Sequence, residues 1–185
     1  GPPAMPYQPG GLWEELAGGA SQGPYVQGTG DDLYRRSLYT HRKRTVPHPT
    51  LTTFDAPSFE YCLARRGRTN TPLQALALLN DTTYVEAARH LAQRMVTEVD
   101  GDARARLAYG FRLATGRNPT ESELNSLQLG YDRYEEKYAS DPEASQALVS
   151  NGESPVPGDI PAATLAAYTP VAGVLLNLDE TLTRE

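Results

Sequence analysis

Apolar residues recur at three- and four-residue intervals through the centre of the chain, which is the spacing of one face of an α-helix. The plainest case runs from about residue 82 to residue 99. An apolar stripe follows this segment, while Glu86, Arg89 and Arg94 fall on its other faces. A second stripe, over residues 124–138, contains three tyrosines, for which we expect contacts in the core or between helices.

Two capping boxes predict where helices begin. In each, a threonine is followed three residues later by Gln or Glu, so each side chain can bond to the backbone N–H of the other residue. Thr71 and Gln74 place the start of one helix at Pro72, and Thr120 and Glu123 start another. The helix from Pro72 is so rich in leucine and alanine that we expect it to be buried.

Breaks and caps divide the rest of the helical region. A helix from Asp102 is expected to end at Gly116, and a short helix is expected over residues 142–149. A surface loop follows. The last helix, over residues 162–178, contains Pro170, which must kink the helix or begin a new one.

The first thirty residues lack this periodicity and are rich in Gly, Pro, Ser and Gln. They predict an extended arm with one short amphipathic candidate around Leu12, Trp13 and Leu16, and Trp13 is expected to anchor the arm on the body. The predicted fold is mainly α. It is a compact multi-helix bundle over residues 31–185, treated as a single helical domain, with a Gly/Pro-rich N-terminal arm (residues 1–30) and a long loop before the C-terminal helix.

The charge balance argues against a nucleic-acid partner. The 185 residues carry a net charge of −6, whereas affinity for phosphate backbones depends on clustered Lys and Arg. No segment approaches the roughly 20 continuous apolar residues that a membrane span needs. We therefore expect neither nucleic-acid binding nor a membrane span.

The sequence has few of the residues that bind a metal ion or attach a haem group. Cys62 is the only cysteine, so an internal disulfide, a thiolate zinc cluster and a Cys-x-x-Cys-His haem attachment are excluded. The three histidines, His41, His48 and His90, do not share a metal-binding spacing. We expect no metal and no cofactor in this chain. For Cys62 we expect a buried structural thiol, and the alternative is a reactive thiolate favoured by nearby Arg65 and Arg66.

Several strings of residues, in this order along the chain, are similar to a known family: DLYRRSLYT (32–40), KRT (43–45), TFDAP (53–57), RR (65–66), RTNTPLQAL (68–76), LND (79–81) and LLNLDE (175–180). Together they resemble the C-terminal part of the planctomycete-specific domain of unknown function that lies downstream of planctomycete cytochrome c-like domains, the planctomycete-specific domain one family. The chain departs from the family pattern at His41, where an aromatic residue is usual, and at Pro170, which interrupts a helix usually free of proline.

The resemblance implies context without a mechanism, because the family has no settled activity. It implies that the chain is a fragment of a larger, exported multidomain protein, located in the periplasm or at the cell surface. Haem is implied only in the upstream cytochrome-like domains of that parent. The implied partners are these upstream domains of the same polypeptide.

Basic residues gather in two short stretches of an otherwise acidic chain, and polar residues flank the helix from Pro72. Together they form the candidate hub: Arg35, Arg36, Arg44, Asp55, Arg65, Arg66, Arg68, Asn70, Gln74, Asn80 and Asp81. In one interpretation the arginines pair with acidic neighbours and the polar residues cap helices and brace loops. In the other, the guanidinium groups bind a carboxylate or sulfate of an acidic polysaccharide.

Two functional hypotheses follow. The first is an uncharacterised helical scaffold or interaction module of an exported cytochrome c-associated protein, which should expose a large apolar patch. The alternative is a carbohydrate-active or anionic-glycan-binding domain with an Arg-rich cleft, which should hold carboxylates with shifted pKa values beside guanidinium groups. No catalytic residue can be assigned from the sequence, and whether the chain is an enzyme stays open.

Overall fold

The computed structural model describes residues 1–13, 24–58 and 60–183, and it divides into two compact units, Gly1–Gln74 and Ala75–Glu185. The fold is mainly helical, as predicted. Residues 14–23 of the predicted arm, including Leu16 of its amphipathic candidate, lie outside the described residues. The predicted division into an arm of thirty residues and a single domain stays a prediction.

The first unit has short helices and a small core. It contains 3-10 helices at Gly30–Tyr34 and Ser37–Tyr39 and one turn of α-helix, α2 (Pro49–Thr53). Ala4 forms a parallel bridge with Thr40, in which the Ala4 N–H donates to the Tyr39 carbonyl at 2.7 Å. The buried Trp13 packs edge-on against Tyr25, with ring centroids 5.1 Å apart. Trp13 also contacts residues beyond the arm: its ring centroid lies 5.7 Å from that of His41 and 4.5 Å from Lys43 Nζ. It therefore anchors the N-terminal segment within this unit, as expected.

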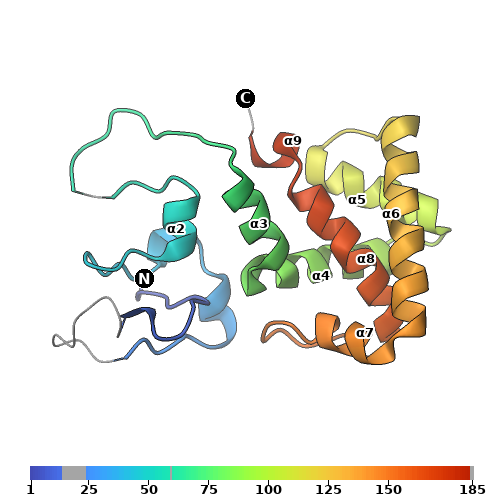
Figure 1. Ribbon diagram of the computed structural model, residues 1–185, viewed down its shortest axis with the longest axis horizontal. Coiled ribbons are helices and arrows are strands. Elements are labelled where there is room, and N and C mark those ends of the chain that lie inside the picture. Colours follow the sequence, from blue (N-terminus) through green and yellow to red (C-terminus); the bar gives the residue numbers. More distant parts are fainter. Residues whose placement is uncertain (14–23, 59, 184–185) are drawn as a thin grey trace. The chain divides into compact units, whose positions relative to one another are not determined.

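The second unit is a bundle of helices (Figure 1). The boundary between the units falls within α3 (Pro72–Asn80). The helices that follow are α4 (Thr82–Thr97), α5 (Ala103–Thr115), α6 (Glu121–Ser140), α7 (Pro142–Val149), α8 (Ala162–Leu176) and α9 (Asp179–Leu182).

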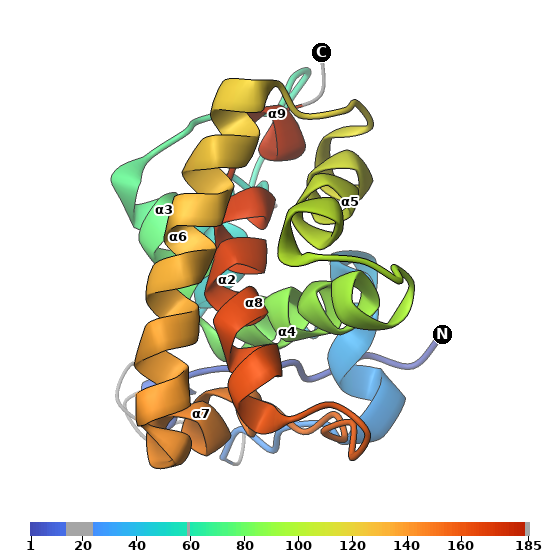
Figure 2. The ribbon, with the colours of Figure 1, turned by 90° about the vertical axis from the view of Figure 1, so that its right-hand side faces the viewer.

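Helix α8 is the centre of this bundle. Nine of its fifteen residues are buried, because its sequence is apolar on every side and most of its surface must be covered by other helices. It packs against α4, α5, α6 and α7 (Figure 2). The helix runs without interruption through Pro170, so the proline does not begin a new helix.

Local capping determines where the helices start and stop, and the predicted caps are confirmed. At the start of α3, the Thr71 N–H donates to Gln74 Oε1 at 2.8 Å and the Gln74 N–H donates to Thr71 Oγ1 at 3.2 Å. Thr120 and Glu123 form the same reciprocal pair at the start of α6. Helix α5 ends at Gly116, whose φ of 83° is left-handed and suits glycine.

Among the described residues, no helix combines the length and apolar character that crossing a bilayer would require.

Two helical glycines of the second unit lie in opposite environments. A Cβ at Gly110 on α5 would lie 2.6 Å from the sulfur of Met95, which is fully buried on α4. A Cβ at Gly130 on α6 would meet no atom within 4 Å. Gly110 therefore allows the close approach of α5 to α4, whereas Gly130 has no such role.

This contrast predicts opposite effects of alanine. We expect Gly110→Ala to lower the free energy of unfolding by about 1 kcal/mol, because overpacking outweighs the gain in helix propensity. We expect Gly130→Ala to raise it by about 0.5–1 kcal/mol, because only the propensity changes. Urea unfolding of both variants measures the difference, and a stabilised Gly110→Ala variant would contradict close packing of α4 on α5.

Candidate functional site

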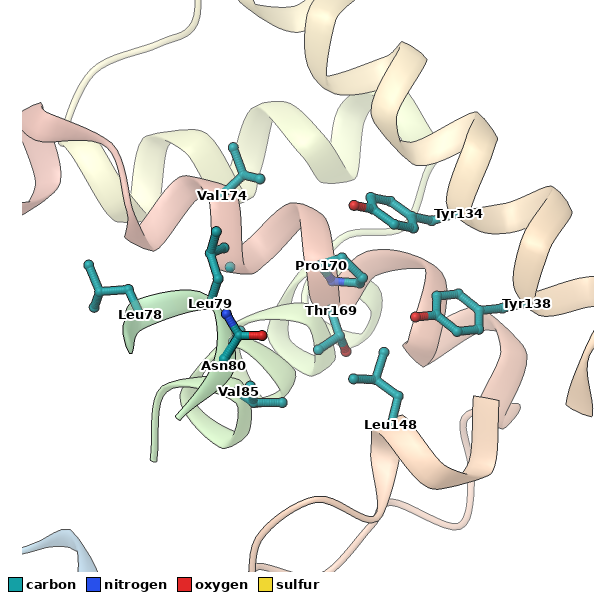
Figure 3. A pocket seen from close by; sticks show the side chains of 12 residues that line it. Leu78, Leu79, Asn80, Val85, Tyr134, Tyr138, Leu148, Thr169, Pro170 and Val174 are labelled. Carbon is teal, nitrogen blue, oxygen red and sulfur yellow. The ribbon is translucent and has the colours of Figure 1, made fainter. Parts of the chain in front are cut away.

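A groove of about 400 Å³ lies along the outer face of α8 in the second unit (Figure 3). Its walls come from the end of α3 and start of α4 on one side and from α6 and α7 on the other. The twelve described residues that line it are all uncharged: Leu78, Leu79, Asn80, Val85, Ala88, Tyr134, Tyr138, Leu148, Thr169, Pro170, Gly173 and Val174. The groove is therefore an apolar surface with a few polar atoms.

The groove exists because α8 carries glycine, threonine and proline, which have short side chains or none, on this face. Gly173 has no side chain, and a Cβ placed there would still lie 3.8 Å from Leu79. The hydroxyl of Thr169 turns back to the Leu165 carbonyl at 2.7 Å instead of reaching outward. The face between the two walls is consequently left unfilled.

Two tyrosines of α6 form one wall of the groove. Tyr134 and Tyr138 are four residues apart, and their rings lie 6.3 Å apart at an angle of 20°. Figure 3 shows both hydroxyl groups directed into the groove, and neither has a hydrogen-bond partner in the part of the chain that the structure describes. The third tyrosine of the predicted stripe, Tyr131, packs against Tyr168 in the core, with ring centroids 4.5 Å apart. The stripe thus serves both the core and the groove.

The prediction that α3 is buried is wrong. Leu73, Leu76 and Leu79 are 61%, 59% and 45% exposed, and only Gln74 and Leu78 on this helix are buried. A helix with leucine or alanine on almost every face gives no direction for its buried side, so the sequence pattern could not show which residues would face water. We call Leu73, Leu76 and Leu79 the exposed leucine row.

Asp55 and Gln74 of the candidate hub are brought together in the first unit. Asp55 Oδ2 accepts hydrogen bonds from the Thr69 N–H at 2.8 Å, the Thr69 hydroxyl at 2.7 Å and Gln74 Nε2 at 3.4 Å. Bonds from Thr69, together with Gln74 and the charge of Arg66, hold the pKa of Asp55 below its ordinary value. Asp55 has a φ of 57°, a left-handed conformation that aspartate tolerates better than most residues. These bonds join the two ends of the segment between Asp55 and Thr69.

The segment held in this way carries the three clustered arginines. Arg65, Arg66 and Arg68 are exposed and form no ion pair with any described residue. We call residues 60–68 the basic loop. Cys62 lies in it and is exposed, so the prediction of a buried thiol is wrong.

The remaining hub residues lie outside this cluster. Arg35 donates to the Pro2 carbonyl at 2.6 Å and lies 3.7 Å from the carboxylate of Asp32. Asp81 caps α4 by accepting from the Thr83 N–H at 2.9 Å. The side chain of Asn80 donates to the Leu76 carbonyl at 2.8 Å.

The other three hub residues, Arg36, Arg44 and Asn70, are exposed. Across the described ranges, no group of three His, Cys, Asp or Glu side chains is placed to hold a metal ion.

The sequence pattern missed a buried ion pair in the second unit. Glu86 and Arg89 on α4 are both almost fully buried, with 3.5 Å between Arg89 Nη2 and Glu86 Oε1. The Ser154 N–H donates to Glu86 Oε1 at 2.6 Å, and the guanidinium of Arg89 donates to the Ser154 carbonyl at 3.0 Å and the Pro155 carbonyl at 3.1 Å. A spacing of three residues is equally common for surface pairs, so the sequence carries no signal that the loop before α8 would cover this one.

Comparison with protein families finds a match over residues 1–130, to the family described as PSD1: Protein of unknown function (DUF1553). The matched residues include the first unit, α3, α4, α5 and half of α6, whereas Tyr134, Tyr138 and the α8 face of the groove lie beyond them. No curated protein and no solved structure matches the chain.

The buried pair predicts a large difference between two arginines of the same helix. We expect Arg89→Leu to lower the free energy of unfolding by about 3–5 kcal/mol, because it leaves the Glu86 carboxylate buried without a cation. We expect Arg94→Leu to cost less than about 1 kcal/mol, because its pair with Glu98 is exposed. Urea unfolding of both variants tests this, and equal, small effects would show that the Glu86 site is open to water.

Proposed function

Because the chain belongs to the PSD1 family of proteins of unknown function, which supplies no activity, we propose that it is a non-catalytic helical interaction module. The proposed partner is the upstream part of an exported, cytochrome c-associated polypeptide, in the periplasm or at the cell surface. Haem, in this proposal, belongs to that upstream part. The observation that carries the proposal is the exposed leucine row.

The exposed leucines favour an interaction because leaving their side chains in water forgoes the free energy that burial would provide. Burying a leucine side chain fully stabilises a protein by roughly 1.5–3 kcal/mol, and three leucines one helical turn apart remain more than two fifths exposed on α3. Leucines scattered singly over a surface are ordinary, but a row on one helix is typical of a surface that another protein covers. Leu76 and Leu79 therefore provide apolar area for a partner.

Replacing one leucine of the row should weaken the association. We expect Leu76→Ser to reduce the affinity for the upstream cytochrome c-like region at least tenfold, because an apolar contact is replaced by a hydroxyl. Leu129→Ser is the matched control: Leu129 is similarly exposed, at 55%, but lies on α6. Isothermal titration calorimetry measures both affinities, and circular dichroism checks that both variants stay folded. Equal affinities of the two variants, or no binding by the unaltered chain, would overturn the proposal.

A second function, binding of an anionic glycan, is favoured by the charge of the first unit. Residues 1–74 contain eight basic and six acidic residues, whereas residues 75–185 contain nine basic and seventeen acidic residues. The first unit is therefore positive by two charges and the second negative by eight. The three exposed arginines of the basic loop add donors in pairs that suit carboxylate and sulfate groups.

This alternative predicts that the basic loop sets the affinity for a sulfated polysaccharide. We expect the triple variant Arg65→Ala, Arg66→Ala, Arg68→Ala to elute from a heparin column at distinctly lower salt than the unaltered chain. Arg133→Ala on α6, which removes an exposed arginine elsewhere, should change the elution far less. Elution of the triple variant together with the unaltered chain would exclude the loop as a glycan site.

A further inference from the structure

The groove on α8 is open to solvent along its rim. Leu79 and Val174, which line it, are 45% and 44% exposed. Its volume of about 400 Å³ lies in the range of ligand sites, but an open rim suits a length of polypeptide better than an enclosed small molecule. The occupant that fits is therefore a segment of a partner chain.

The absence of charge in the lining limits the chemistry of that segment. The groove residues are uncharged, so an acidic or basic side chain entering the groove would lose its hydration without gaining a counterion. The segment must be uncharged where it contacts the groove. This requirement distinguishes the groove from the basic loop, which suits an anion.

The tyrosine wall specifies the segment further. Tyr134 and Tyr138 present two nearly parallel rings, and their hydroxyls point into the groove without a partner among the described residues. A proline-rich segment in the polyproline II conformation has free carbonyl oxygens, and its prolines have no N–H to satisfy. Its carbonyls would accept from the hydroxyls, and a pyrrolidine ring would pack against Tyr134, which is more exposed than the buried Tyr138.

An amphipathic helix fits less well. Its backbone carbonyls are already bonded within the helix, so they leave both tyrosine hydroxyls without acceptors unless suitable side chains are added. We propose that the groove on α8 binds an uncharged, proline-rich extended segment of a partner polypeptide, recognised by Tyr134 and Tyr138. This inference rests on the proposed interaction function and names the kind of segment that one of its surfaces takes.

A capped polyproline peptide, titrated into the full chain and followed by calorimetry and by NMR, tests the inference. We expect binding that shifts the resonances of Tyr134 and Tyr138, and we expect the double variant Tyr134→Phe, Tyr138→Phe to bind at least tenfold more weakly. This variant keeps both rings and removes only the hydroxyls, so it should stay folded. Tyr109→Phe is the matched control, because Tyr109 lies on α5 outside the groove.

The result also separates this inference from the proposed function. Leu76 does not line the groove, so Leu76→Ser should leave polyproline binding unchanged while weakening the association with the upstream region. No binding of polyproline, or binding that the double variant leaves unaltered, would overturn the inference. A capped amphipathic leucine–alanine helix that bound the groove more tightly than polyproline would also overturn it. In each case the titration of Leu76→Ser with the upstream region would still test the leucine row.

Discussion

Helix α8 has no polar face, and covering it is the constraint on which the second unit depends. Leu165, Tyr168 and Leu175 are almost fully buried because α4, α5, α6 and α7 each turn apolar residues toward the helix. One strip of α8, which includes Pro170, Gly173 and Val174, lines the groove. The groove is therefore a consequence of the same packing, and Val174 in its lining is the one exposed residue of α8.

The two units keep their irregular segments in place by different means. In the second unit, the loop before α8 is hydrogen-bonded to the buried Glu86–Arg89 pair. A backbone N–H of the loop donates to Glu86, and backbone carbonyls of the loop accept from Arg89, so the buried charges and the loop backbone are both hydrogen-bonded. In the first unit, the carboxylate of Asp55 accepts hydrogen bonds from Thr69 and Gln74 and joins the two ends of the segment that carries the basic loop. Both sites fix a loop by hydrogen bonds, but the Glu86–Arg89 site is buried and the Asp55 site lies near the surface.

These features describe a module with surfaces of distinct chemistry. The second unit offers an uncharged groove beside Leu76 and Leu79 of α3, while the first unit carries the exposed arginines of the basic loop. The family match supplies no reaction. In the proposed function, these surfaces, which differ in charge and polarity, bind different parts of a partner.

The sequence by itself determined the features that depend on neighbours within a few residues. Thr71 with Gln74 and Thr120 with Glu123 cap their helices because each pair meets across one helical turn, and the glycine at residue 116 ends α5 because its backbone can be left-handed. Tertiary structure alone decided which faces meet water. The leucines of α3 and the pair of Glu86 and Arg89 have helical spacing that fits either location, and burial was settled by elements distant in sequence: the loop before α8 covers the charged pair, whereas Leu76 and Leu79 are left exposed.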